Sequence, residues 1–256
     1  MGNGAITGYI DVAQIVLYVF WAFFAGLIYY LHRENKREGY PLENDRSGSI
    51  HVEGFPGVPS PKTFLLRDGR TVSVPNTLRE ERELAAEPNG AFLGAPLEPT
   101  GNPMVDGIGP GSWSQRADIV DTTIDGAARI VPLRAAPGFS MSHKDPDPIG
   151  LPVTGADGVV GGTVVDVWVD RAEALFRYLE IEVQGAEGLR RVLLPVNFSR
   201  IGSRGVRVRS ILGAQFQHVP GTRDAEQVTL LEEDRIVAYY GGGTLYATPR
   251  RQEPLL

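Results

Sequence analysis

The pattern of apolar residues changes sharply near the start of the chain. Eighteen of the twenty residues 12–31 are apolar, and only Gln14 and Gly26 interrupt them. A helix rises about 1.5 Å per residue, so this length covers the hydrocarbon layer of a bilayer, about 30 Å thick. Tyr29 and Tyr30 close the run, where aromatic rings with a polar tip meet the lipid headgroups. The pattern predicts a transmembrane helix over residues 12–31.

Three other interpretations fit this segment less well. A cleaved signal peptide begins with basic residues, but residues 1–11 contain no Lys or Arg, and Asp11 is acidic. An amphipathic helix lying in the membrane interface has a polar face, which this segment lacks. A core helix of a small soluble domain is rarely apolar on every face for so long. The spanning helix is therefore favoured.

Basic residues flank the span on one side only. His32, Arg33, Lys36 and Arg37 follow it, and none precedes it. The positive-inside rule then places residues 32–256 in the cytoplasm and residues 1–11 on the other side. Arg33, Lys36 and Arg37, together with Tyr30, are candidate contacts for anionic lipid headgroups, although the basic cluster could equally serve topology alone.

Glycine and proline punctuate residues 39–115, as in the runs GFPG at 54–57 and GPG at 109–111. This density breaks any long helix or strand. Apolar anchors nevertheless recur along the segment, namely Tyr40, Phe55, Phe64, Phe92 and Trp113. A segment with anchors but no core of its own is expected to lie on a larger surface rather than to be disordered. We therefore expect residues 32–115 to form an extended, irregular docking arm.

From about Ile130 the pattern becomes that of strands. Apolar and polar residues alternate over residues 164–170, 179–183 and 205–209, while glycine-rich turns separate the runs. Short strands without crossover helices predict a small antiparallel β-barrel or sandwich within residues 116–256. Residues 222–240 are expected to form a short helix that closes this mainly β cytoplasmic domain. Within the first run, the alternation places Val165, Val167 and Val169 on one face of the strand and Asp166 and Asp170 on the other.

Composition narrows the function classes. The chain has 256 residues, 25 Lys and Arg against 31 Asp and Glu, and a net charge of −6, which argues against nucleic acid as a partner. No cysteine is present, so disulfides and thiolate chemistry are excluded. The four histidines are scattered, and phosphate-loop, nucleophile-elbow and zinc-protease motifs are missing. We expect no catalytic residue, no metal site and no cofactor held by this chain alone.

A group of carboxylates is the most informative polar feature. Asp166, Asp170, Glu173, Glu180 and Glu182 lie within seventeen residues, with Arg171 and Arg177 among them. They can be the solvated face of a strand and turn. They can also be a proton relay, because neighbouring carboxylates raise at least one apparent pKa toward neutrality. Asp170 and Glu173 are three residues apart and could face a common partner, with Arg177 limiting the rise in pKa. The residues alone leave both interpretations open.

A family resemblance extends over essentially the whole chain. It is carried by FW at 20–21, AGLIYYL at 25–31, REGYPLE at 37–43, PKTF at 61–64, PTGNPM at 99–104, GIGP at 107–110, IGLPV at 149–153, VDVWVD at 165–170, YLEIE at 178–182 and VTLLEED at 228–234. With these motifs the chain resembles the H subunit of the photosynthetic reaction centre of purple bacteria. Residues 150–219 also resemble a PRC-barrel, a small β-barrel.

The resemblance implies a structural, non-catalytic subunit that caps the cytoplasmic side of the L and M subunits. Those partners would hold bacteriochlorophyll, bacteriopheophytin, quinones and a non-haem iron, and this chain none of them. The implied location is the bacterial inner (intracytoplasmic) membrane, with a periplasmic N-terminus. Membrane lipids are expected partners, and a light-harvesting ring and a cytochrome subunit are further candidates. The alternative is a membrane-tethered PRC-barrel adaptor with no role in electron transfer.

The resemblance also implies a path for protons to the secondary quinone. Glu173 matches a glutamate near the secondary-quinone pocket, and Asp170 and Arg177 match the residues that accompany it. Asp125 matches an acidic residue that is followed by two histidines in well-studied relatives, where they form a surface proton-uptake and metal-inhibition site. Ala127, Ala128 and Arg129 stand here instead. We therefore expect Zn²⁺ to inhibit this protein less than those relatives.

Overall fold

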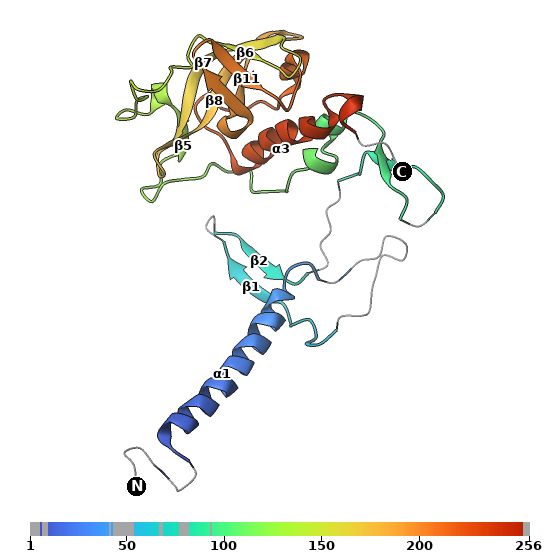
Figure 1. The fold of residues 1–256 in the computed structure, drawn as a ribbon, viewed down its shortest axis with the longest axis vertical. Helices are drawn as coiled ribbons and strands as arrows, with labels where there is room; N and C mark the ends of the chain where they lie inside the picture. The colour runs from blue at the N-terminus through green and yellow to red at the C-terminus, as the bar shows by residue number, and fades with distance from the viewer. Residues whose placement is uncertain are drawn as a thin grey trace. The chain divides into compact units, whose positions relative to one another are not determined.

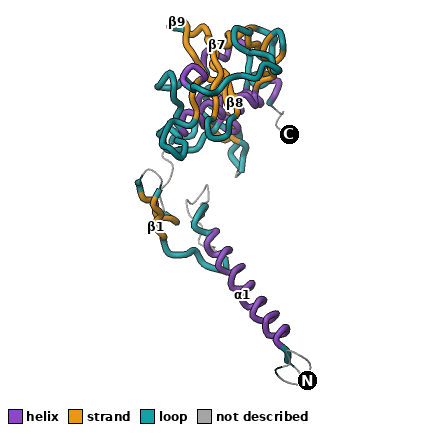
Figure 2. The backbone as a smooth tube through the Cα atoms, turned by 90° about the vertical axis from the view of Figure 1, so that its left-hand side faces the viewer, coloured by secondary structure: helices purple, strands orange, loops and turns teal. Residues whose placement is uncertain are grey.

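The computed structural model describes residues 6, 10–40, 42, 54–66, 69–76, 82–92 and 94–252. The chain divides into two compact units, Met1–Arg82 and Glu83–Leu256. Figures 1 and 2 show the two units, and each is described by itself. The four segments proposed from the sequence (1–11, 12–31, 32–115 and 116–256) stay a prediction, because they were defined by composition and membrane topology rather than by contacts.

The first unit contains helix α1, Val12–Asn35, whose N-terminal N–H groups are capped by the Asp11 carboxylate accepting from Gln14 N at 2.7 Å. It is the helix, among the described residues, that is long and apolar enough to cross a membrane. None of its residues is buried within the chain, so its apolar side chains are free to face lipid or a partner. The helix continues four residues beyond the predicted end, because the polar residues 32–35 contain no helix breaker.

Arg37 binds the chain that follows α1 to the end of this helix. Its guanidinium donates two hydrogen bonds of 2.8 Å to the Glu34 carboxylate and further bonds to the carbonyl oxygens of Ser60 (2.7 Å) and Val74 (3.4 Å). Val74 ends the hairpin of β1, Lys62–Leu65, and β2, Thr71–Val74. One side chain thus joins the helix end to a loop and to a hairpin more than twenty residues away.

Lys36 has a similar role at the same end of the helix. Its side chain is buried and donates to the carbonyl oxygen of Pro56 at 2.5 Å. The neighbouring Phe55 ring is highly exposed and lies 5.9 Å, centroid to centroid, from the ring of Tyr29. The start of the predicted arm is therefore held against the last turns of α1 by specific contacts.

The second unit is built on a seven-stranded curled sheet with the order β10-β11-β6-β7-β8-β9, in which β5 also pairs with β7. The strands are β5 (Ile130–Pro132), β6 (Pro152–Thr154), β7 (Val160–Asp170), β8 (Leu175–Gly185), β9 (Gly188–Pro195), β10 (Ser199–Gly202) and β11 (Gly205–Val208). Figure 2 shows β7, β8 and β9 within this unit. The predicted fold class, one apolar N-terminal helix with a mainly β barrel-type domain, is confirmed. One detail is wrong, because β6 and β11 pair in parallel rather than antiparallel.

Smaller elements precede the sheet. A short hairpin joins β3, Ala86–Pro88, to β4, Leu97–Pro99. After it come α2, Pro103–Asp106, and a 3-10 turn, Gly109–Gly111, and both pack against α3, Leu230–Tyr246. The predicted arm was expected to be irregular, but its described residues include two hairpins and two helical turns.

The orientation of residues in β7 differs from the expected alternation. Asp166 is 7% exposed and Asp170 0% exposed, so both carboxylates, which the solvated-face interpretation placed in water, are buried. The reason is twofold. The register of β7 with β8 shifts at two bulges, between Val164 and Asp166 and between Trp168 and Val169, and a bulge reverses the alternation of faces. β7 also pairs with β8 on one side and with β6 and β5 on the other, so no edge of it is free.

Helix α3 closes the unit. Thr229 begins it with a capping box, in which its hydroxyl accepts from Glu232 N and the Glu232 carboxylate accepts from Thr229 N. This cap explains why the helix begins at Leu230 and not at residue 222, and it continues beyond the predicted end at 240. Its buried face, which includes Tyr239 and Tyr240, packs on the core that Trp168, Leu179 and Phe216 share. Figure 1 shows α3 lying beside the sheet.

The close packing of α3 generates a stability prediction. A methyl group at Gly243 would lie 2.5 Å from the carbonyl oxygen of Ser210 and 2.5 Å from Cγ2 of Ile211. Gly243→Ala is therefore expected to lower the free energy of unfolding by about 1–3 kcal/mol, although alanine favours helix. The measurement is unfolding of the full chain in detergent, followed by near-ultraviolet circular dichroism. Gly26→Ala is the matched control, since nothing lies within 4 Å of that position. Equal losses in the two variants would contradict the packing argument.

Candidate functional site

A buried carboxylate lies where β7 ends. Asp170 is the last residue of β7, and its Oδ1 accepts the backbone N–H groups of Ala172 (3.0 Å) and Glu173 (3.1 Å). The short turn that they form leads directly into β8, and Ala174 completes it with a φ of +53°. An aspartate at this position is typical of a turn that bonds its own backbone two and three residues on. Glu173 is thereby held at the tip of the turn.

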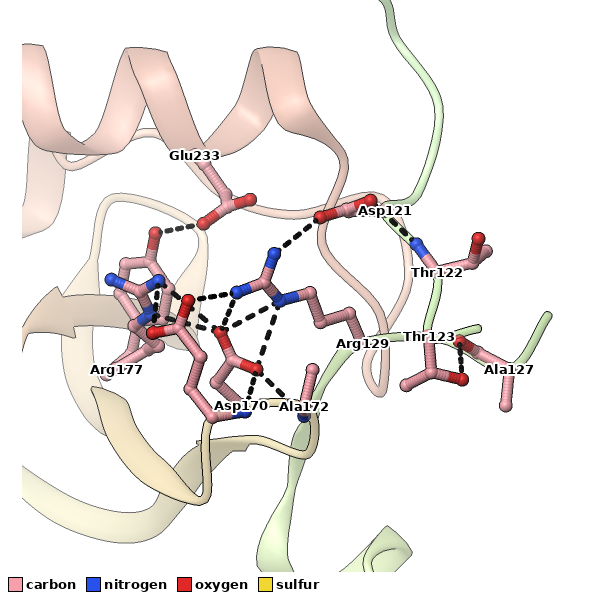
Figure 3. A network of polar contacts seen from close by, with 11 residues as sticks. Asp121, Thr122, Thr123, Ala127, Arg129, Asp170, Ala172, Arg177 and Glu233 are labelled. Carbon is pink, nitrogen blue, oxygen red and sulfur yellow. Dashed lines mark hydrogen bonds and ion pairs between the residues drawn. The ribbon is translucent and has the colours of Figure 1, made fainter. Parts of the chain in front are cut away.

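Arg129, the residue directly before β5, approaches this carboxylate. The pairing of Ile130 with Asp170 places Arg129 beside the turn, and its carbonyl oxygen accepts Arg171 N at 2.9 Å. Its guanidinium lies 2.9 Å from Asp170, 3.2 Å from Asp121 and 2.5 Å from Glu173. Figure 3 shows the guanidinium between Asp121 and Asp170. One cation therefore faces three carboxylates.

Glu173 is the most exposed side chain of the network. Its side chain is 47% exposed, with Oε1 bonded to Arg129 and Oε2 3.4 Å from Nη2 of Arg177. Arg177 also lies 3.4 Å from Asp170. The expectation that Asp170 and Glu173 face a common partner is met by Arg129, and Arg177 lies beside both. Whether Glu173, Asp170 and Arg177 handle protons stays a prediction.

The surroundings of Asp170 lower the pKa of its carboxyl group. Burial raises the pKa of Asp170, but hydrogen bonds from Arg129 and from the N–H groups of Glu173 and Ala172 outweigh burial and hold this pKa below its ordinary value. The pKa of Asp170 is thus shifted opposite to the rise that crowded carboxylates can cause, and the hypothesis that at least one pKa of the cluster is raised stays a prediction. It is a permanent negative charge near neutral pH and a fixed partner for the arginines.

Glu233 and Tyr178 extend the network and were missed from the sequence. Tyr178 of β8 donates its hydroxyl to Glu233 of α3 at 2.8 Å, and Figure 3 shows Glu233 reaching toward the strands from the helix. Burial raises the pKa of Glu233 more than Tyr178, Arg116 and Arg177 lower it. A hollow of about 520 Å³ beside Arg177, Tyr178 and Glu233 has room for several waters. The helix-start pattern at 229–233 concealed this residue, because a glutamate there is usually a capping group.

The other carboxylates of the sequence cluster form a second, separate group. Arg134 donates to Asp166 at 2.8 Å and to Glu180 at 2.6 Å, and Trp168 Nε1 donates to Glu180 at 2.9 Å. Glu180 is 3% exposed. The solvated-face interpretation is therefore wrong for Asp166, Asp170 and Glu180. Glu182 is half-buried, and within the described chain its carboxylate has no hydrogen-bond partner.

Asp125 lies outside both groups. It is exposed in the turn after Thr122, next to Gly126, whose φ is +81°. Ala127 and Ala128 follow it, and in the described residues no three acidic or histidine side chains gather as metal ligands. The part of Asp125 in proton uptake and the weak effect of Zn²⁺ stay predictions.

The candidate lipid contacts have unlike surroundings. Tyr30 and Arg33 are exposed on α1, whereas Lys36 is buried and Arg37 is occupied by backbone and carboxylate oxygens. Tyr30 and Arg33 are thus the two side chains open to headgroups. Contact of any of the four with lipid stays a prediction.

Two family models match the chain. Residues 4–135 match the photosynthetic reaction centre, H-chain N-terminal region, and residues 142–215 match the PRC-barrel domain. The first match covers just over half of the chain and includes α1, both hairpins, Asp121, Asp125 and Arg129. The second covers β6 to β11 and thus Asp170, Glu173 and Arg177. The candidate network therefore draws its residues from both matched regions.

The lowered pKa of Asp170 generates a prediction about pH. Ionised Asp170 stabilises the fold above pH about 4, the ordinary range of the group, and this stabilisation is lost as the pH falls through the lower folded-state value. Asp170→Asn is expected to lower the free energy of unfolding at pH 7 by about 1–3 kcal/mol, and the difference from wild type should shrink below pH about 4. Thermal unfolding of the full chain in detergent between pH 2 and 7 measures it. Asp145→Asn, on an exposed loop, is the control; a pH-independent loss in Asp170→Asn would refute the ionised pair.

Proposed function

Because the chain belongs to the H-chain family of the photosynthetic reaction centre, we propose that it caps the cytoplasmic side of the L and M subunits and conducts protons to the secondary quinone. It is a subunit of a photosynthetic membrane complex, and α1 is its candidate span. The basic residues after α1 support a cytoplasmic position for the rest of the chain. The match over residues 4–135 favours this function over that of a tethered adaptor.

Exposed apolar side chains support the capping role. Phe55 is 82% exposed and Leu65 76% exposed in the first unit, and Phe92 is 66% exposed in the second. Side chains of this size are costly to leave in water, and they mark surfaces that meet other proteins or lipid. The L and M subunits, which in this proposal hold the pigments, quinones and non-haem iron, are the partners that would cover them. This chain would contribute no reacting cofactor of its own.

The need for a proton path follows from the chemistry of quinones. A quinone that takes two electrons in a buried site must also take two protons, because an uncompensated charge is expensive away from water. The protons must come from the cytoplasm through groups that can hold them one at a time. A subunit on the cytoplasmic side lies across that route, so it has to supply such groups.

The observation that carries the proposal is the position of Glu173. It is exposed to solvent, yet it shares Arg129 and Arg177 with the buried, ionised Asp170. When Glu173 takes a proton from water, both arginines still have the Asp170 carboxylate as a partner, so no cation is left unpaired. Proton gain and loss at Glu173 therefore require no rearrangement of the network. Asp170 sets the charge, and Glu173 carries the proton.

Glu233 supports the same path one step further in. Its pKa is raised by burial, and its carboxylate accepts a hydrogen bond of 2.8 Å from the hydroxyl of Tyr178, beside the hollow of about 520 Å³. When negative charge forms near such a carboxyl group, its pKa rises and the fraction of molecules in which it is protonated increases. Glu173 and Glu233, which both lie near Arg177, are proposed as successive proton holders. Asp125 is a candidate uptake point on the surface.

The role of Glu173 is tested by substitution in the intact complex. Glu173→Gln keeps the shape but cannot carry a proton, so the proton-coupled second electron transfer to the secondary quinone is expected to slow at least about ten-fold, or about 1.4 kcal/mol on the barrier. Flash spectroscopy between pH 6 and 9 measures the rate. Glu182→Gln, the same change on β8 outside the network, is the control. An unchanged rate in Glu173→Gln would refute the assignment.

The role of Glu233 has a separate readout. Glu233→Gln is expected to reduce the proton uptake that accompanies the first reduction of the secondary quinone, because the raised pKa makes Glu233 respond to new charge. The reduction should be greatest above pH about 4.3, where an ordinary glutamate is already ionised. A pH-indicator dye in a lightly buffered sample measures the uptake after one flash. Glu187→Gln, in an exposed turn, is the matched control, and equal uptake in both variants would exclude Glu233.

A further inference from the structure

Four arginines gather on the β10–β11 hairpin without acidic partners. Arg200 lies in β10, Arg204 in the turn, Arg207 in β11 and Arg209 just after it, and all four are exposed. In the part of the chain that the structure describes, none of them forms an ion pair. In the same unit Arg129 and Arg134, by contrast, are each paired with carboxylates. We call these four residues the arginine face.

The strand register concentrates this charge. Arg200 and Arg207 are directly opposite each other in the antiparallel pair, and Arg207 and Arg209 alternate with buried Val206 and Val208. Three guanidinium groups therefore stand on the same side of the hairpin. Like charges directly opposite each other destabilise a pair of strands. An anion that binds between them would remove this repulsion.

The surface between these arginines is hollowed and lined with hydroxyl groups. One hollow, of about 410 Å³, is lined by Arg200, Arg204 and Arg207 with Thr154 and Ser203. A second, of about 420 Å³, is lined by Arg200, Arg207 and Arg209 with Ser199, Ser210 and Thr244. Arg200 and Arg207 line both hollows. Guanidinium forks are the groups that bind phosphate oxygens here, since the hydroxyls of Thr154, Ser199 and Thr244 already donate to backbone carbonyl oxygens.

We propose that the arginine face binds the phosphate headgroups of anionic phospholipids. Two adjoining hollows that share Arg200 and Arg207 suit two neighbouring phosphates, as a lipid surface presents them. The chain carries its own candidate membrane span, which would tether the second unit to a bilayer. The face would then hold the barrel domain to the membrane independently of the capping role.

The test uses the full chain in lipid nanodiscs. One set contains phosphatidylcholine alone, and the other contains phosphatidylcholine with phosphatidylglycerol. Hydrogen exchange of the amides of residues 199–209, measured by mass spectrometry, reports whether the face is covered. Exchange should be several-fold slower in the anionic discs, and removing one arginine should weaken docking about five-fold, equivalent to about 1 kcal/mol per basic residue at an anionic surface.

Matched variants separate docking from general charge effects. Arg207→Gln, and more strongly the double variant R200Q/R207Q, should lose the slow exchange, whereas Lys144→Gln, which removes an exposed charge elsewhere on the unit, should keep it. Unchanged exchange in β7 to β9 would show that the fold is intact. Equal exchange in the two kinds of disc, or equal behaviour of Arg207→Gln and Lys144→Gln, would overturn the proposal. Slower amide exchange on adding inorganic phosphate to phosphatidylcholine discs would also overturn it, because the ligand would then be a soluble anion. Exchange that slows only after assembly with other subunits would overturn it too, because the face would then bind an acidic protein.

Discussion

The fully buried carboxylate of Asp170, held by Arg129 and by two backbone N–H groups, organises one end of the barrel. It closes the turn between β7 and β8 and so positions Glu173 at the tip of that turn. Through Arg129 it also joins β5 and the preceding Asp121 to the sheet. A buried charge is tolerated only when it is paired and hydrogen-bonded. Burial of the Asp170 carboxylate therefore depends both on the ion pair with Arg129 and on the hydrogen bonds of the turn. The candidate proton site is thus a by-product of how this turn is stabilised.

The same principle distinguishes the two acidic groups of the second unit. Asp166 and Glu180 surround Arg134 and are almost without contact with water, so they suit a fixed structural charge. Around Asp170, by contrast, an exposed Glu173 and a Glu233 of raised pKa lie next to the hollow that admits water. A carboxylate relay needs groups whose proton can come and go. Among the described residues, only the group around Asp170 provides them.

Much of this could be read from the sequence, and the failures have physical causes. The span follows from eighteen apolar residues in twenty, and the strands from their alternation, because these signals are local. The burial of Asp166 and Asp170 could not be read, because it depends on two bulges and on pairing with β5. Arg129 was noticed only as a replacement for histidine, and Glu233 was hidden within a helix start. Both contact Asp170 or Tyr178 from segments about forty to sixty residues away, and no local pattern records that.

The central claim is that Glu173 takes and releases a proton while Asp170 stays ionised beside it. Light-induced infrared difference spectroscopy of the intact complex, recorded as the secondary quinone is reduced, observes carboxyl protonation directly. The expected result is a carboxylic acid C=O band that vanishes in Glu173→Gln and persists in Asp170→Asn and Glu182→Gln. A spectrum that is identical in wild type and Glu173→Gln, or a band lost only with Asp170, would contradict the claim.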